Sequence, residues 1–231
     1  MTVRLRILTA NLWNGKADGP GVARVVAEEG VDVACLQEVT HVQAQALRAV
    51  LPHGRIEPAE DHSGMGIAMR QPGKVAWLPL PYRSMRAARL DPKDWLGLSD
   101  PVHVWNVHMR APTQWPPLRT VKIRRGQLRG LLGHLERPAA PRLVLVGDFN
   151  ASPVWPVYRR VAERIPDIAL EAAQRRSAEP ARTWAPWTGA KRLRLLRIDH
   201  AFGRGVTVLD VRSVHLPGSD HDGLVIDLGV D

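Results

Sequence analysis

The sequence predicts an α/β fold in which two mixed β-sheets pack together and helices cover their outer faces. Two observations lead to this prediction. Short apolar runs of strand length recur along the chain, and helical patterns alternate with them early, with meander-like segments between. No repeat of fixed period and no linker divides the 231 residues, so we expect a single domain over residues 1–231.

The first fifty residues alternate between strand and helix. Residues 3–11 begin with alternating apolar and arginine side chains, which predicts a half-exposed strand that ends at Asn11. Residues 20–29 are expected to form a helix, closed by the glycine that follows. Residues 31–36 are typical of a buried strand, and residues 40–50 of a helix that begins with a threonine cap.

The middle of the chain is mainly extended. Residues 54–90 are strand-like, and residues 64–70 are the clearest strand among them. In the strand expected at 102–108, alternation places His108 on the same face as two valines and an asparagine. The best helix spans 118–136, with a leucine stripe and a basic stripe, which a solvated face would explain. The basic stripe consists of Lys122, Arg125 and Arg129.

The apolar run at residues 143–146 ends abruptly in Gly-Asp-Phe-Asn. Because alternate side chains of a strand share a face, Asp148 and Asn150 should project together while Phe149 packs on the other side. This arrangement pairs a carboxylate that can bind a metal with an amide that can donate to a phosphate oxygen. The alternative is a strand followed by an Asx turn.

The last third of the chain contains helices, a basic loop and strands. The loop at residues 177–197 carries Trp184 and Trp187 and ends in a basic stretch at 191–197. The expected helices cover residues 154–165 and 168–176, and the expected strands cover 198–202, 206–214 and 224–228.

The composition limits the classes of function. The chain has 32 basic and 23 acidic residues, and its net charge of +9 attracts polyanions without proving that it binds nucleic acid. No apolar run approaches the ~20 residues of a membrane span, and the N-terminus lacks a signal-peptide pattern. The single cysteine, Cys35, lies in an apolar run and should be buried. We therefore expect a cytoplasmic protein, and we expect a monomer.

Polar side chains recur at the ends of the apolar runs. A carboxylate in such a position, as at Glu38, is costly to bury unless a metal ion or a salt bridge pairs with it. Because the ends of adjacent strands meet at one rim of a sheet, these side chains should form a ligand site there. The set comprises Asn11, Glu38, His108, Asp148, Asn150, Asp199, Asp220 and His221.

The segments that carry these residues resemble, in order, the motifs of the endonuclease/exonuclease/phosphatase superfamily, which includes DNase I-like nucleases and several phosphatases. The resemblance runs from near the first residue to near the last. It implies a four-layered α/β sandwich and metal-assisted hydrolysis of a phosphoester, usually with Mg²⁺ and with Mn²⁺ as an alternative. The matching segments are Thr9-Ala10-Asn11, Leu36-Gln37-Glu38, Asn106-Val107-His108, Gly147-Asp148-Phe149-Asn150, Ile198-Asp199-His200 and Ser219-Asp220-His221.

The resemblance also implies a set of metal-binding residues. Glu38 would be the main metal ligand, Asn11 would help to bind the metal or to orient groups around it, and Asp220 would lie beside it. Carboxylate and amide oxygens suit a hard divalent cation, which neutralises the charge that builds up on a phosphoryl group during displacement.

The remaining residues receive catalytic roles from the same resemblance. Asp148 would position the attacking water, Asn150 would donate to the phosphate, and His108 would bind a non-bridging oxygen. Asp199 would orient His221, because a histidine held by a carboxylate has a fixed tautomer. The general base is either His221 or Asp148.

Two positions depart from the family pattern. The residue after Asp199, which is often aromatic in the family, is His200, and we expect it to replace a packing ring. Some relatives pair the histidine at the His108 position with a carboxylate from an earlier strand. The corresponding region of this sequence offers only Asp61.

Three functions are compatible with these observations. The net charge, the basic stretch and two tryptophans favour a nucleic-acid endonuclease. A phosphatase or phosphodiesterase for a phospholipid or a small phosphoester would use the same centre, with Trp115, Trp184 and Trp187 as an apolar wall. An inactive binding module of the same fold should have lost at least one of the polar residues, and all of them are present.

Overall fold

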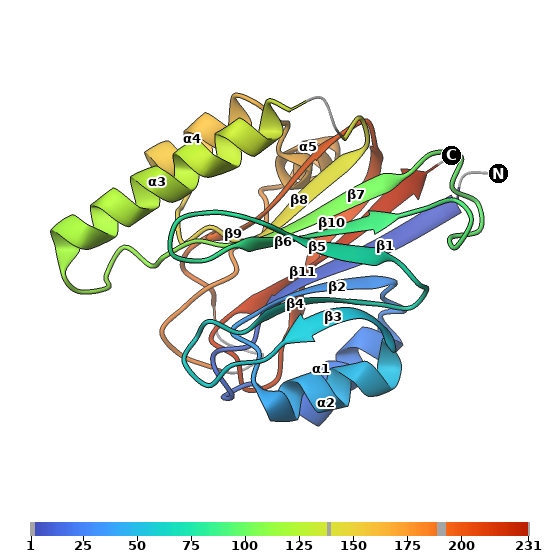
Figure 1. The fold of residues 1–231 in the computed structure, drawn as a ribbon, viewed down its shortest axis with the longest axis horizontal. Helices are drawn as coiled ribbons and strands as arrows, with labels where there is room; N and C mark the ends of the chain where they lie inside the picture. The colour runs from blue at the N-terminus through green and yellow to red at the C-terminus, as the bar shows by residue number, and fades with distance from the viewer. Residues whose placement is uncertain (1–2, 138–139, 189–192, 231) are drawn as a thin grey trace.

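The computed structural model describes residues 3–137, 140–188 and 193–230, and it contains two β-sheets (Figure 1). The strand orders are β10-β11-β1-β2-β4-β3 and β5-β6-β7-β8-β9. The pairs β1–β2 and β7–β8 are parallel, and the remaining pairs between these strands are antiparallel. The strands are β1 (Val3–Asn11), β2 (Val33–Gln37), β3 (His53–Glu57), β4 (Met65–Met69), β5 (Lys74–Leu78), β6 (Met85–Leu90), β7 (Val102–His108), β8 (Leu143–Asp148), β9 (Asp199–Arg204), β10 (Thr207–His215) and β11 (Asp222–Val230).

Helices cover the outer faces of both sheets, which confirms the predicted four-layered α/β sandwich (Figure 1). The helices α1 (Gly19–Glu28) and α2 (His41–Val50) pack on the six-stranded sheet. The helices α3 (Pro117–Leu135) and α4 (Pro156–Ala162) pack on the five-stranded sheet, and α5 (Ile168–Arg175) packs beside β9 and β10. Among the described residues, no helix is long and apolar enough to cross a membrane.

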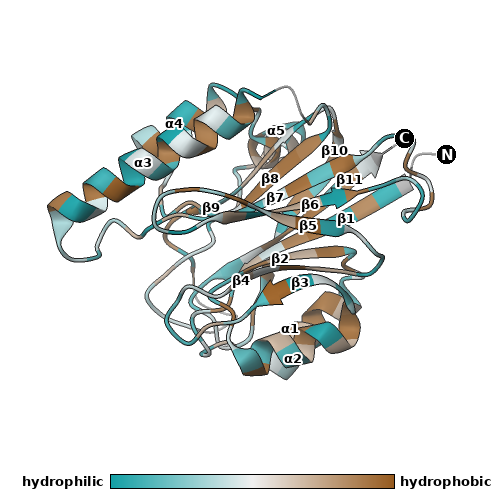
Figure 2. Cartoon of the chain, viewed as in Figure 1, coloured by the Kyte–Doolittle hydropathy of each residue, from teal (hydrophilic) through white to brown (hydrophobic). Residues whose placement is uncertain are grey.

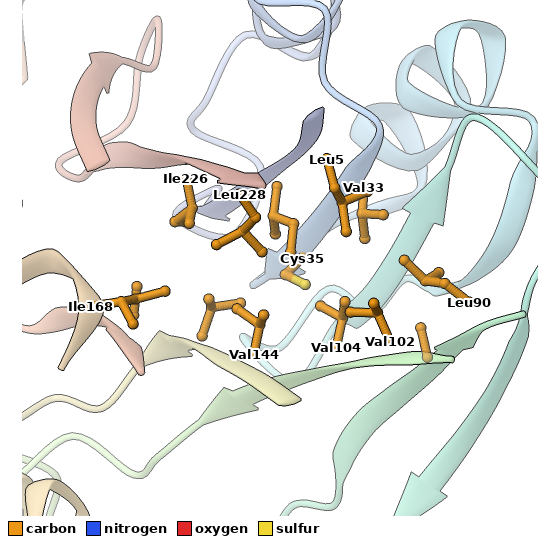
Figure 3. Close-up of a cluster of buried hydrophobic side chains, with 14 of the residues drawn as sticks. Leu5, Val33, Cys35, Leu90, Val102, Val104, Val144, Ile168, Ile226 and Leu228 are labelled. Atoms are coloured by element: carbon orange, nitrogen blue, oxygen red, sulfur yellow. The ribbon is translucent and has the colours of Figure 1, made fainter. Parts of the chain in front are cut away.

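The largest core cluster lies between the two sheets (Figure 3). Val33 and Cys35 of β2 point into this cluster, as does Val144 of β8. The residues that follow Cys35 and Val144, which are Leu36 and Leu145, face the helices. The central strands are therefore apolar on both faces, and the helices are mixed (Figure 2). Each square ångström of apolar surface removed from water stabilises the fold by roughly 25 cal/mol. The packing of strands on both faces is therefore the main source of stability.

Both parallel pairs deliver polar residues to the space between the sheets. Asn11 lies opposite Gln37 at the ends of β1 and β2, and His108 lies opposite Asp148 at the ends of β7 and β8. Because side chains alternate along a strand, each of these residues continues an inward-facing apolar row. The polar ends of the four strands thus meet within the sandwich.

Element boundaries differ from the predictions in only a few places. The helix α4 begins at Pro156 instead of residue 154, because proline has the backbone angle of the first helical turn and needs no hydrogen-bond acceptor there. The buried face of α3 contains Arg124 and Gln127 in addition to leucines. At the opposite end of β1 from Asn11, Val3 pairs with Val230, so the described ends of the chain lie side by side (Figure 1).

Candidate active site

A cavity of about 590 Å³ lies at the strand ends where the two sheets meet. It brings together side chains from segments that lie far apart in the sequence. The remaining predicted residue, Asp199, is buried and contacts His221. The predicted residues that line the cavity are Asn11, Glu38, His108, Asp148, Asn150, Asp220 and His221.

Asp148 is held in place by three hydrogen bonds. Its Oδ2 accepts from the side-chain amides of Asn11 (3.0 Å) and Asn150 (2.9 Å), and its Oδ1 accepts from the backbone N–H of Asn150 (2.7 Å). The amide of Asn150 also donates to the carbonyl of Met109 at 3.0 Å. Both asparagines therefore fix the carboxylate, and both amide hydrogens of Asn150 are used within the protein.

Asp199 and His221 form a buried pair, in which Nδ1 of His221 lies 2.8 Å from Oδ2 of Asp199. Burial lowers the pKa of His221, but the charge and hydrogen bond of Asp199 outweigh burial, with help from Asp148, and raise this pKa to about 10. The hydroxyl of Ser219 accepts from the backbone N–H of His221 and donates to the carbonyl of Asn11. It thereby fixes the histidine to the end of β1.

Acidic groups are crowded in the cavity. Burial, followed by the negative charge of Asp199, raises the pKa of Asp148 to about 7, although His221 acts in the opposite direction. Asp220 accepts a hydrogen bond from Nε1 of Trp184 at 2.9 Å through Oδ2. Its buried Oδ1 accepts no hydrogen bond from the described residues and lies 3.9 Å from Nε2 of His221. A divalent cation takes carboxylate oxygens as ligands, so the residues present fit a metal ion.

Among the described residues, one group of carboxylate and imidazole donors is close enough together to hold such an ion. Asp148, Asp199 and His221 each offer a ligand atom, and these atoms lie within 4.8 Å of one another. Glu38 lies near this group, because its Oε1 is 3.6 Å from Nε2 of His108, which is itself 3.7 Å from Oδ2 of Asp148.

Several residues that line the cavity have left-handed backbone conformations. Glu38, directly after β2, has φ 54°, and its Oε2 lies 2.6 Å from Nδ1 of His62, which has φ 62°. Trp13, Tyr82 and Asn150 also line the cavity with positive φ values. Non-glycine residues in this region store strain and concentrate at functional sites, so the backbone independently supports this location.

His108 is paired with Arg83, whose Nη1 contacts Nδ1 of the imidazole. Because arginine only donates hydrogen bonds, Nδ1 accepts, and Nε2 carries the proton that faces Glu38 and Asp148. Burial, together with the charge of Arg83, keeps the pKa of His108 well below its usual value. Asp61, the only carboxylate that the sequence offered for this role, instead accepts from Ser63 at the surface.

His200 belongs to the core rather than to the cavity. Its Nε2 donates to the carbonyl of Ala151 at 2.7 Å, and its ring contacts Phe149, Tyr158 and Phe202. The imidazole therefore occupies the place of a packing ring, as expected. Phe149 likewise points away from its neighbours Asp148 and Asn150 into buried packing.

Much of the expected basic stretch at 191–197 is structural. Arg194 is buried and pairs with Asp222 at 2.6 Å, and Arg197 is buried and pairs with Asp167 at 2.5 Å. Lys191 and Arg192 lie outside the described residues. The two buried arginines fix the loop to its neighbours and present no free charge to a ligand.

Of the tryptophans proposed as a substrate wall, only Trp184 lines the cavity, and its indole N–H is bonded to Asp220. Trp187 donates to the carbonyl of Leu193 at 3.3 Å, and Trp115 is 82% exposed. Sequence analysis missed the lining residues Arg83 and Trp155. These residues lie in irregular segments, where no periodicity fixes the direction of a side chain.

Comparisons with known proteins agree with this architecture. The Endonuclease/Exonuclease/phosphatase family model matches residues 8–221. No curated protein is significantly similar to the chain in sequence.

Solved structures resemble the chain over almost its whole length. A functionally unknown conserved protein from Enterococcus faecalis V583 is 19% identical with a TM-score of 0.72, covering 98% of this chain and 100% of that one. D. rerio TDP2 complexed with single strand DNA product is 19% identical (TM-score 0.71; 98% and 99% covered). The 3'-5' exonuclease (NExo) from Neisseria meningitidis is 20% identical (TM-score 0.70; 96% and 98% covered). These likenesses establish the fold, and the family match over most of the sequence establishes that the chain belongs to the endonuclease/exonuclease/phosphatase family, whose fold is that of phosphoester hydrolases.

Proposed function

We propose that this chain is a divalent-metal-dependent hydrolase that cleaves phosphodiester bonds in nucleic acid. The observation that carries the proposal is the convergence of Asp148, His108 and His221 in one cavity, where His221 is paired with Asp199. The same cavity holds a buried carboxylate oxygen of Asp220 that accepts no hydrogen bond from the described residues. Nucleic acid as the substrate is supported by the net charge of +9 and by the fold shared with an exonuclease and with a DNA-bound protein.

Glu38 and Asp220 are the residues that would hold the cation, which we expect to be Mg²⁺ or Mn²⁺. Oε1 of Glu38 and Oδ1 of Asp220 accept no hydrogen bond at normal distance from the described residues, so both have lone pairs for a metal. When bound, the cation would supply positive charge that stabilises the developing negative charge on the phosphoryl oxygens.

The protein side chains supply the positioning and the proton transfer. Asp148 would position the attacking water, and either this carboxylate or the Asp199–His221 pair would take its proton. His108 would donate from Nε2 to a non-bridging oxygen, since its other nitrogen accepts from Arg83. We expected Asn150 to donate to the phosphate, but both hydrogens of its amide are already used, so we assign it the role of positioning Asp148.

A substrate panel tests this function. Supercoiled plasmid, single-stranded DNA, a bis-aryl phosphodiester and phospholipids would be incubated with the protein and Mg²⁺, with the Asp148→Ala protein as the blank. We expect nicking or degradation of DNA that the blank lacks. Turnover of none of these substrates would refute the proposed hydrolase, and turnover of phospholipids alone would refute the nucleic-acid assignment.

One observation favours a phospholipid or small phosphoester as the alternative substrate. Trp155 lines the cavity and is 40% exposed, and Trp115 and Leu118 are more than 80% exposed in the segment that leads into α3. Exposed apolar side chains near a cavity are typical of proteins that act at lipid surfaces. The substrate panel separates this alternative from a nuclease.

A further inference from the structure

A groove lies next to the active-site cavity, and its lining surface is mainly apolar but includes three basic residues. The groove runs between the loop before β6 and the exposed face of α3, and its volume is about 520 Å³. Tyr82 lines both the cavity and the groove, so the two are adjacent. We name it the α3 groove, and its lining residues are Pro81, Tyr82, Arg119, Lys122, Ile123, Gly126 and Arg129.

The cations of the α3 groove have no counter-ion among the residues that the structure describes. Arg119, Lys122 and Arg129 form no ion pair within the described parts of the chain, and neither does the neighbouring Arg125. Elsewhere arginines are commonly paired, as Arg86 is with Glu57 and Arg212 is with Glu29. The surface of α3 therefore presents a concentrated positive charge that the protein itself does not neutralise.

The position of these charges opposes the stability of the helix. The first turn of α3 contains no acidic residue, whereas Arg119 and Lys122 lie in its first two turns. The N-terminal end of a helix carries partial positive charge, so the positive charge of Arg119 in the first turn is unfavourable for the helix. Sequence choices that work against local stability are expected where a surface has a function.

The geometry points to the phosphate backbone of a nucleic-acid strand as the ligand of the α3 groove. From Arg119 to Arg129 the helix advances by about 15 Å, a length over which one strand of a B-form duplex carries about four phosphates. The groove would hold the strand on one side of the scissile bond, and Tyr82 marks the place where the strand leaves the cavity. The inference rests on the proposed function, because it extends the same substrate beyond the reacting phosphate.

Packing of the loop against α3 keeps the groove in place. A Cβ at Gly126 would lie 3.2 Å from Cγ of Pro81, and one at Gly130 would lie 2.9 Å from Cδ2 of Leu80. Side chains at these positions would crowd the side chains of Pro81 and Leu80, so the two glycines allow the loop to lie close to the helix. The close approach therefore keeps Tyr82 beside the cations of the helix.

Binding without catalysis tests the inference. Affinity for a fluorescent single-stranded oligonucleotide and for a duplex would be measured by anisotropy in EDTA at several salt concentrations. The test variant carries Arg119→Gln, Lys122→Gln and Arg129→Gln. The control carries Arg24→Gln, Arg48→Gln and Lys74→Gln, which remove the same charge from exposed side chains elsewhere. These three side chains form no ion pair with the described residues, although Arg48 donates a hydrogen bond to the carbonyl of Ile56.

We expect the test variant to bind about tenfold or more weakly, with the slope of log affinity against log salt smaller by about two to three. The control should stay within about twofold of the wild type. Equal losses in both variants, or no loss in the test variant, would overturn the inference. So would a result in which the test variant binds oligonucleotide normally but loses binding to phosphatidylglycerol vesicles, because the groove would then be a membrane surface.

Hydrolysis of a bis-aryl phosphodiester separates the inference from the proposed function. The groove cations lie outside the lining of the cavity, so the test variant should turn over this small substrate as the wild type does. A wild type that binds strands through the groove but hydrolyses nothing would refute the proposed hydrolase and leave the binding surface intact. Melting temperatures of all three proteins verify that each is folded.

Discussion

Gln37 and Asn106 join the two sheets directly beneath the polar strand ends, with Nε2 of Gln37 2.6 Å from Oδ1 of Asn106. The amide of Asn106 continues across the same interface and donates to the carbonyls of Leu36 and Gly66 at 2.9 Å. Both side chains are fully buried. This bridge fixes the position of one sheet against the other at the point where the cavity begins.

Replacing Asn106 with leucine should therefore reduce both stability and activity. The change removes the donor to two carbonyls and one of the acceptors of the Gln37 amide, at a cost of about 2–4 kcal/mol in the free energy of unfolding. It should also lower kcat, because His108 lies two residues further along β7. Urea unfolding and small-diester turnover measure the two effects. Unchanged values of both would mean that the bridge has no structural role.

Asp148→Asn and His221→Asn should each lower kcat by about a thousandfold or more. Asp148→Asn should leave the melting temperature at pH 8 nearly unchanged. The change removes a charge that burial and Asp199 disfavour, but the new amide nitrogen cannot accept hydrogen bonds from Asn11 or Asn150. The matched control is Asp210→Asn, which removes a carboxylate that pairs with Arg176 outside the cavity. Wild-type turnover in both site variants would refute the site assignment.

Arg83→Gln should lower kcat/KM by about 10- to 100-fold, which corresponds to the loss of one charge-assisted hydrogen bond at His108. Arg83→Lys should recover only part of the activity, because an ammonium group lacks the planar fork of the guanidinium. Arg89→Gln serves as the control, since Arg89 lies on β6 and pairs with Asp91. Equal effects of the changes at positions 83 and 89 would mean that only surface charge matters.

Mg²⁺ or Mn²⁺ should raise the melting temperature, and EDTA should reverse the rise and stop hydrolysis. A ligand at about one hundred times its Kd adds about 2.7 kcal/mol to the stability of the folded state, which is about 5–10 °C for a chain of this size. Glu38→Gln should reduce the rise, whereas Glu171→Gln on the surface of α5 should not. A rise of the same size in NaCl of equal ionic strength would indicate simple screening of the acidic cavity.

Acid should destabilise the fold through His200. Burial first, then the charge of Arg197, lowers the pKa of His200 to about 4 in the folded state, against about 6.5 in the unfolded chain. The stabilising contribution of the neutral ring is therefore present above pH 6.5 and is lost as the pH falls toward 4, by about 3 kcal/mol. His200→Phe should remove this loss, so that its stability relative to the wild type rises as the pH falls. A difference between the two proteins that does not change with pH would contradict this explanation.

The sequence was most informative where the period of a strand fixes the side chains. Asn11, His108 and Asp148 each lie two or four residues after an inward-facing apolar residue of the same strand. Because alternate side chains of a strand share a face, this spacing alone places the three residues on the inward face. The cavity confirms that these side chains converge. The layered fold could be predicted for a similar reason. A strand that is apolar on both faces must be covered on both faces, which requires a layer on each side of its sheet.

The charges of individual residues could not be interpreted from the sequence. Arg194 and Arg197 look like part of a basic surface, but their partners Asp222 and Asp167 lie 28 and 30 residues away. The basic stripe of α3 was interpreted as a solvated face, and its three residues are exposed, but two of them also line a groove beside the cavity, which the sequence did not reveal. Long-range pairing decides which charges are free, and no local pattern encodes it.

The pairing of Val3 with Val230 has a practical consequence for work with this protein. The two ends of the described chain meet at one end of β1, and Asn11, which lines the cavity, lies at the other end, about 25–30 Å away. An affinity tag, a surface tether or a fused protein at either end would project away from the substrate entrance. A short peptide that joins the two ends would also make circular permutation feasible, with new ends opened in a loop remote from the catalytic groups.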